Sequence, residues 1–232
     1  MKIYSFTFAR SGSQGIKNKN LKIFNKKPLV HWAIKDALKS KLINKTFIST
    51  DSKKIANVAK KAGAIIPFFR PKKLSTSNSP EYLSWRHAIN FLKDKEDLPD
   101  IFLSVPCTSP LRTSNDLDNM IKLFVKEKAD FVVGICESDR SPYFNLMQIK
   151  NNKLEVFSKR KKNIFRRQDC PKTYNLSTFA FIAKPDYILN NTNFYSGKAK
   201  GYIIDKKRSI DIDELMDLEY AEFLRKKHAI KK

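Results

Sequence analysis

Two aspartates near the end of the chain have a spacing that suits a metal ion. They stand in the sequence SIDID at residues 209–213. In an extended segment, residues two apart project to the same side, so Asp211 and Asp213 offer two carboxylates about 7 Å apart along the chain. Paired hard oxygens suit Mg²⁺, which also keeps waters and substrate phosphates. The alternative is that Asp213 caps the last helix.

A basic, glycine-containing loop is the second candidate for chemistry. Residues 10–20, RSGSQGIKNKN, follow the first apolar strand-like run directly. Glycines and serines allow backbone N–H groups to turn toward a phosphate, while Arg and Lys neutralise its charge. The sequence is neither G-x-G-x-x-G nor the G-x-x-x-x-G-K-[ST] P-loop. The alternative is a solvated surface loop.

A third group follows the fourth predicted strand. Thr108, Ser109 and Arg112 lie in the sequence TSPLR. These residues either bind a nucleotide at the end of a strand or fix the loop as a structural turn. The histidines have no triad order or metal-ligand spacing, and we interpret them as structural or surface residues.

Alternating strands and helices must position these loops. The predicted strands are residues 2–8, 46–49, 64–69, 100–105 and 131–136, and the predicted helices are 28–38, 51–62, 80–92 and a helix capped by Ser114 or Asn115 and ending at 127. The order predicts an α/β fold: a three-layer, Rossmann-like, mostly parallel sheet of the nucleotide-diphospho-sugar transferase type. Ligands of such sheets bind beyond the carboxyl ends of the strands.

The pattern changes after residue 137. Residues 143–168 contain two short strand candidates, a basic stretch and many apolar side chains. Strands at 176–183 and 202–204 and a helix at 213–227 follow. We expect one domain over residues 1–232 with a small inserted lobe at about 140–170, whose apolar side chains indicate an interface.

The chain is strongly basic, with 46 Lys+Arg against 23 Asp+Glu and a formal charge of +23. Either a polyanionic partner or compositional drift explains this excess, and scattered lysines without a groove-reading motif make nucleic acid an improbable partner. No apolar run approaches the ~18 residues that a membrane span needs. Three cysteines without CxxC spacing and no leader-like start predict a reduced, cytoplasmic protein without a zinc site.

Taken in order, several segments resemble the acylneuraminate cytidylyltransferase family, the CMP–nonulosonic acid synthetases. The matching segments are ARSGSQGIKNKNLK at 9–22, STD at 49–51, RP at 70–71, TSPLRT at 108–113, RRQDCP at 166–171 and SIDIDELMDLEYAE at 209–222. The resemblance implies transfer of CMP from CTP to the anomeric hydroxyl of an acidic 2-keto sugar, with release of pyrophosphate.

The resemblance also assigns roles. It implies that Arg10, Lys19 and Asp211 are catalytic and that Asp211 and Asp213 bind Mg²⁺. The substrate-binding residues that it implies are Ser13, Asn20, Arg70, Thr108, Ser109, Arg112, Arg167 and Gln168. It further implies a homodimer formed through the lobe, in which Arg166 and Arg167 approach the neighbouring active site and suit a sugar carboxylate.

The chain departs from the pattern of sialic-acid members in the base and sugar regions. Val105-Pro106-Cys107 precedes TSPLR where those members carry a base-contacting Gln, and no basic residue stands near Phe144. The identity of the sugar acid and the strictness for CTP therefore stay open. The alternatives are a nucleotidyltransferase with altered base or sugar choice, a non-catalytic relative and a polyanion-binding protein.

Overall fold

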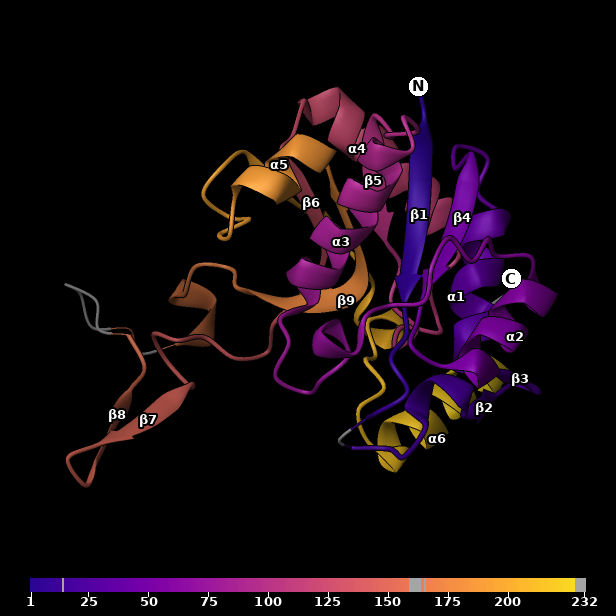
Figure 1. Cartoon of the computed structure of the whole chain (residues 1–232). Helices are drawn as coiled ribbons and strands as arrows, with labels where there is room; N and C mark the ends of the chain where they lie inside the picture. The colour runs from indigo at the N-terminus through magenta and orange to yellow at the C-terminus, as the bar shows by residue number, and fades with distance from the viewer. Residues whose placement is uncertain (14, 159–163, 165, 228–232) are drawn as a thin grey trace.

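The computed structural model describes residues 1–13, 15–158, 164 and 166–227. Six strands form one sheet in the order β10-β6-β9-β5-β1-β4 (Figure 1). Their bounds are β1 Ile3–Phe8, β4 Lys45–Ser49, β5 Ile101–Ser104, β6 Phe131–Glu137, β9 Tyr174–Ala183 and β10 Ala199–Ile203. All neighbours pair in parallel except β9, which is antiparallel to both β5 and β6. The predicted mostly parallel sheet is confirmed.

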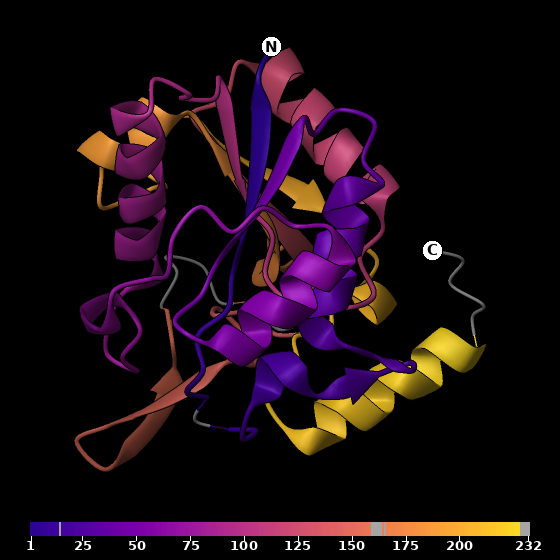
Figure 2. The same ribbon diagram turned by 45° about the vertical axis from the view of Figure 1, so that its right-hand side comes forward.

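Helices cover both faces of the sheet, as Figure 2 shows. Their bounds are α1 Leu29–Leu38, α2 Lys53–Ala62, α3 Glu81–Asp94, α4 Ser114–Glu127, α5 Pro185–Asn190 and α6 Leu215–Lys227. One hydrophobic cluster packs α1, α2, α4 and α6 against one face, and a second packs α3 and α5 against the other. Alternation along the strands explains this division, since Ile48 belongs to the first cluster and Phe47 to the second. The predicted three layers are therefore present.

Local signals fix the ends of several helices. The Ser52 side chain accepts a hydrogen bond from the backbone N–H of Ile55 at the start of α2, and Gly63 ends that helix with φ 104°. Both features agree with the prediction for residues 51–62. Helix α4 is capped by Thr113, which exchanges hydrogen bonds with Asp116 in a capping box. The prediction of a cap at Ser114 or Asn115 was wrong by one or two residues, because the capping box selects Thr113.

The predicted strand at 64–69 is wrong. Only isolated parallel bridges form there, from Ile65 to Phe47 and from Phe69 to Thr50. Pro67 lies between the bridges and has no N–H to donate to a ladder, so a continuous strand does not form. The segment still runs beside β4 and delivers Arg70 to the ends of the parallel strands, where the Arg70 N–H donates to the carbonyl of Thr50 at 2.8 Å.

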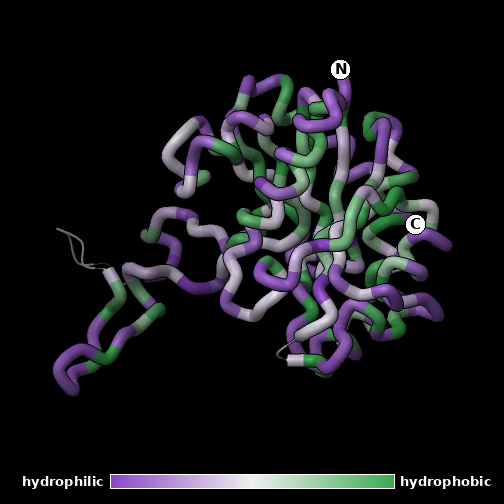
Figure 3. The backbone as a smooth tube through the Cα atoms, viewed as in Figure 1, coloured by the Kyte–Doolittle hydropathy of each residue, from purple (hydrophilic) through white to green (hydrophobic). Residues whose placement is uncertain are grey.

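A β-hairpin projects from the body of the molecule (Figure 1). Strands β7 Met147–Lys150 and β8 Lys153–Val156 form their own antiparallel sheet, as the two strand candidates of the lobe predicted. Asn151 and Asn152 make the tight turn with φ 51° and 57°, a conformation that asparagine tolerates. Figure 3 shows hydrophobic residues along this hairpin, away from the two core clusters.

Short elements complete the chain. They are the two-stranded sheet of β2 Ile23–Phe24 and β3 Lys27–Pro28 and the 3₁₀ turns Lys19–Leu21, Lys72–Leu74, Arg167–Asp169 and Lys206–Arg208. Within the described ranges, no helix has the length and apolar character that crossing a membrane requires.

Candidate active site

A pocket of about 290 Å³ lies where the loops after the parallel strands meet. The loop after β1, the segment around 70–84, the loop after β5 and the segment before α6 supply its walls. The lining residues are Phe8, Arg10, Ser13, Gly15, Lys19, Asn20, Arg70, Leu74, Thr76, Ser79, Glu81, Ser84, Thr108 and Asp213. Seven predicted site residues are among them, although they come from four segments that are far apart in the sequence.

Hydrogen bonds hold the loop after β1 in place. The Ser11 N–H and hydroxyl donate to the Asp51 carboxylate at 2.8 and 2.6 Å. The Asn20 side-chain amide donates to the Arg10 carbonyl at 3.0 Å. Asn20 thus shapes the loop while lining the pocket. Across the described residues, the Arg10 guanidinium has no hydrogen bond or ion pair with the protein, which leaves its donors for an anion.

The loop also touches the segment that carries the two aspartates. Lys19 Nζ lies 2.7 Å from Asp213 Oδ1. A Cβ added at Gly15 would lie 2.3 Å from the Asp213 carbonyl oxygen, so only glycine permits this approach. The backbone N–H groups of Asp213 and Glu214 donate to Asp217 Oδ2. Asp217 therefore does the capping before α6, and the Asp213 carboxylate pairs with Lys19 instead.

Asp211 lies deeper than Asp213. Its Oδ1 is buried and has no hydrogen-bond partner of good geometry within the described residues. Burial raises the pKa of the Asp211 carboxyl; the nearby hydroxyls of Thr108 and Thr178 lower it, and the charge of Asp213 raises it further. A buried acceptor of this kind is costly unless something binds it.

The pair Asp211 and Asp213 meets the minimum requirement for Mg²⁺. No group of three or more His, Cys, Asp or Glu side chains suited to a metal occurs in the part of the chain that the structure describes. Two carboxylates, one with an unused buried oxygen, fit an ion that completes its shell with water and phosphate oxygens. They do not form a closed site made of protein ligands alone.

Comparison with known proteins identifies the family. The sequence model of a family described as Cytidylyltransferase matches residues 7–232. The chain belongs to this cytidylyltransferase family. It is 34% identical to CMP-N,N'-diacetyllegionaminic acid synthase of Campylobacter jejuni and 31% identical to Post-translational flagellin modification protein B of Campylobacter coli. Each match covers 93% of this chain and 92% of the relative.

A solved structure shares the fold. The structure of CMP:2-keto-3-deoxy-manno-octonic acid synthetase complexed with CTP aligns with a TM-score of 0.73. The alignment covers 98% of this chain and 100% of that chain at 10% sequence identity. At this sequence identity the match supports the fold of the cytidylyltransferase and no more specific property.

Two predicted binding residues of this cytidylyltransferase are structural. Arg112 is completely buried: its guanidinium donates to the carbonyls of Phe179 and Pro106, and its Nε lies 4.0 Å from Asp36 Oδ2. Ser109 is also fully buried, with its hydroxyl 3.0 Å from that of Thr178. Neither lines the pocket. The prediction of substrate contact is corrected for both, because the loop turns them into the core; of the three, only Thr108 faces the pocket.

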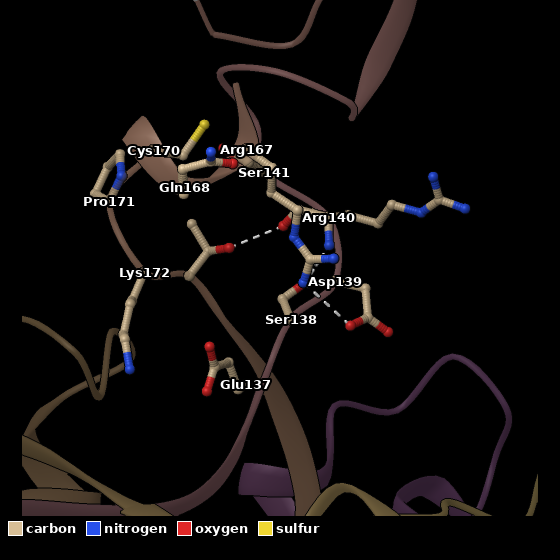
Figure 4. Close-up of a pocket in the computed structure, with 11 residues that line it drawn as sticks. Glu137, Ser138, Asp139, Arg140, Ser141, Arg167, Gln168, Cys170, Pro171 and Lys172 are labelled. Atoms are coloured by element: carbon tan, nitrogen blue, oxygen red, sulfur yellow. Dashed lines mark hydrogen bonds and ion pairs between the residues drawn. The ribbon is translucent and has the colours of Figure 1, made fainter. Parts of the chain in front are cut away.

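Arg167 and Gln168 lie in a second pocket, of about 380 Å³ (Figure 4). It shares no lining residue with the first pocket. Arg167 Nη2 lies 3.3 Å from Asp139 Oδ1, and the Thr173 hydroxyl donates to the carbonyl of Arg140. Within this chain, therefore, the predicted sugar-binding arginine is not part of the first pocket.

Glu81 is a pocket residue that sequence reasoning missed. It is the first residue of α3, and its Oε1 accepts hydrogen bonds from Trp85 Nε1 at 3.1 Å and from the Ser104 hydroxyl at 3.3 Å. The residue keeps solvent access through the pocket, yet surrounding protein desolvates its carboxylate. This burial raises the pKa of Glu81, while the two hydrogen bonds and Arg70 lower it. An acidic residue in the first turn of a helix was the only signal in the sequence, and it is also an ordinary helix feature.

Proposed function

We propose that this cytidylyltransferase transfers CMP from CTP to the anomeric hydroxyl of an acidic 2-keto sugar of the nonulosonic type. The observation that carries the proposal is the convergence of Arg10, Lys19 and Arg70 with Asp213 in one pocket; Asp211, two residues before Asp213, is half-buried and does not line the pocket itself. The names of similar proteins support the sugar class, since one is a CMP-N,N'-diacetyllegionaminic acid synthase and another is a pseudaminic acid cytidylyltransferase.

The reaction is a displacement at the α-phosphorus of CTP. The sugar oxygen forms a bond to phosphorus, the bond to the bridging oxygen breaks and pyrophosphate leaves, and the hydroxyl proton passes to solvent. The protein contributes charge and position: Arg10 and Lys19 neutralise phosphate oxygens, and the Gly15 loop presents its backbone to them. No covalent enzyme intermediate is required.

A panel of nucleotides and sugar acids tests the proposed function. Pyrophosphate release is measured with CTP, UTP, ATP or GTP against several 2-keto sugar acids, with Mg²⁺ present. We expect turnover with CTP and at least one nonulosonic acid, and a fall of at least tenfold in kcat/KM for CTP in Arg10→Ala, because charge-assisted phosphate contacts contribute about 1.5–3 kcal/mol. Absence of CMP-sugar with every acid, or an unchanged Arg10→Ala variant, contradicts the proposal.

We further propose that Asp211 and Asp213 hold Mg²⁺. Held by these two carboxylates, the ion would supply positive charge to phosphate oxygens of the bound nucleotide. Titration of the apoprotein with Mg²⁺ in the presence of CTP, followed by thermal shift, measures this without turnover. Asp211→Asn is expected to abolish the metal-dependent rise in Tm, whereas Asp139→Asn, in the second pocket, keeps it. An equal rise in wild type and Asp211→Asn counts against the assignment.

We propose that residues 140–170 form a dimerisation lobe within a single domain. The apolar side chains exposed there are Leu146, Met147, Ile149, Leu154 and Phe157. Ile149 is 77% exposed and Leu154 68%, which is unusual for aliphatic residues of a single copy. A second copy covering this face explains them, and it provides a way for Arg166 and Arg167 to reach the partner's pocket.

Light scattering in moderate salt tests the dimer. The expected mass is twice the 26.9 kDa of the chain. Two variants form a matched pair: Ile149→Lys on the hairpin and Ile203→Lys on the exposed edge of the sheet. Only Ile149→Lys should dissociate the dimer, because Ile203→Lys removes apolar surface outside the proposed interface. A monomeric mass for wild type rules out the dimer; a dimer in which Arg167→Ala keeps its KM for the sugar rules out the shared site.

The free cysteines suit a reducing compartment, and we propose that the enzyme acts in the cytoplasm.

A further inference from the structure

Two carboxylates line the pocket: Asp213 pairs with Lys19, whereas the charge of the other is wrong for the proposed substrates. CTP and a sugar acid are both anions, and Arg10, Lys19 and Arg70 suit them. Glu81 lines the same pocket with a carboxylate. A carboxylate repels phosphate and carboxylate groups, so it must face a neutral part of a substrate that donates hydrogen bonds.

The position of the Glu81 carboxylate is fixed by its neighbours. Trp85 and Ser104 both donate to Oε1, from the same helix and from the end of β5. Among the described residues, no hydrogen bond reaches Oε2. The side chain therefore keeps an acceptor in a defined place, free for a ligand.

Arg70 lines the same pocket and has an unused donor. The residue is only 6% exposed, and its Nε and Nη1 donate to the hydroxyls of Ser75 and Ser84. Its Nη2 is buried and finds no partner within the described ranges. Arg70 and Glu81 attract each other electrostatically, yet they form no ion pair within 4.0 Å. Arg70 thus keeps an unused donor and Glu81 an unused acceptor, and the two groups are not paired with each other.

We propose that Glu81 selects the base of the nucleotide, by accepting a hydrogen bond from the 4-amino group of cytosine while Arg70 donates to the ring nitrogen or carbonyl beside it. The inference rests on the proposed function and deepens it. Cytosine presents an amino donor next to acceptors, which complements a carboxylate and a guanidinium that line one pocket without pairing with each other. Uracil presents a carbonyl oxygen in place of the amino group, and Glu81 repels it.

Binding of nucleotides alone tests the proposal. The dissociation constants of CTP, dCTP and UTP are measured by calorimetry with Mg²⁺, for wild type and for Glu81→Gln. Wild type is expected to prefer CTP over UTP by at least tenfold, in line with one base contact. The Gln amide presents either a carbonyl or an amino group, so the CTP/UTP ratio is expected to collapse toward unity, with UTP binding improved.

A matched control separates this effect from net charge. Glu127→Gln removes the same charge from α4, where Glu127 pairs with Lys200 outside the pocket. Its CTP/UTP ratio should equal that of wild type. A CTP analogue without the 4-amino group provides a second measurement that does not depend on any variant: it should bind wild type at least tenfold more weakly than CTP.

The outcomes are distinguishable. If wild type binds no CTP, the proposed function fails. If wild type prefers CTP but Glu81→Gln keeps the ratio, or if the analogue binds as well as CTP, base selection by Glu81 is overturned while the function stands. If Glu81→Gln weakens CTP but leaves dCTP unchanged, Glu81 contacts the ribose and the proposal is equally overturned.

Discussion

Replacing Arg112 by alanine separates structural stabilisation from substrate binding. The side chain is completely buried, and its guanidinium donates to the main-chain carbonyls of Phe179 in β9 and Pro106 after β5. It also lies 4.0 Å from the carboxylate of Asp36 in α1. One side chain therefore connects two sheet elements and a helix. Its loss must weaken the fold before it affects any ligand.

The structure sets the size of the effect. Each buried carbonyl that loses its donor costs about 1–3 kcal/mol, and the cavity left by truncation adds to this. Alanine also removes the cost of burying a charged guanidinium, which offsets part of this loss of stability. Breaking a buried charge pair typically costs about 3–5 kcal/mol in total. For a chain of this length, that corresponds to a fall in Tm of about 6–20 °C.

Thermal and urea unfolding measure the stability, and kinetics below the lowered Tm measure binding. The KM for CTP of Arg112→Ala should stay within about twofold of wild type at such temperatures. Arg10→Ala is the contrast, because its guanidinium lines the pocket: it should lose kcat/KM with little change in Tm. A stable Arg112→Ala variant with a KM raised tenfold refutes the structural interpretation.

Three further expectations concern two glycines of the loop after β1, Glu81 and the buried Cys107. Gly15→Ala should lose at least tenfold in kcat/KM, because the added Cβ meets the Asp213 carbonyl, whereas Gly12→Ala meets only the end of a flexible side chain at 3.7 Å and should stay near wild type. Glu81→Gln should raise the Tm of the ligand-free protein at pH 7. The fold raises the pKa of the Glu81 carboxyl, so the wild-type protein loses stability as the pH rises above the unfolded-state pKa of about 4.3. The difference in Tm between the two proteins should therefore vanish below about pH 4. Cys107, whose pKa burial raises to about 12, should stay unmodified by a thiol reagent at pH 8 until the protein unfolds.

Local chemistry explains which parts of the fold could be predicted. Ser52 and Gly63 mark the ends of α2 by interactions within a few residues, so the sequence carries the whole signal. The orientation of β9 depends on partners far away along the chain, and an apolar strand pattern is the same in either direction. The short helix α5 was missed because its six residues are too few for a periodic pattern.

The same distinction holds in the pocket. Arg10, Lys19 and Asp213 follow or precede regular elements at the ends of the sheet, where folds of this class bind ligands, and all three line one pocket. Whether an arginine faces solvent or core depends on the path of the loop, and the sequence TSPLR does not reveal that Arg112 turns inward. Glu81 was missed because the approach of Ser104 to it is a tertiary contact.

The antiparallel strand at the centre of the sheet also sets an order of assembly. Strands β1, β4 and β5 pair with one another and are complete by Ser104, early in synthesis. Strand β6 has no place beside them until β9, which ends at Ala183, inserts between β5 and β6. While the ribosome works through the intervening segment at about 5–20 residues per second, the edges of β5 and β6 are unpaired and open to wrong partners. Strand β9 therefore joins β6 to the part of the sheet formed by β1, β4 and β5, and the nascent chain depends on its arrival.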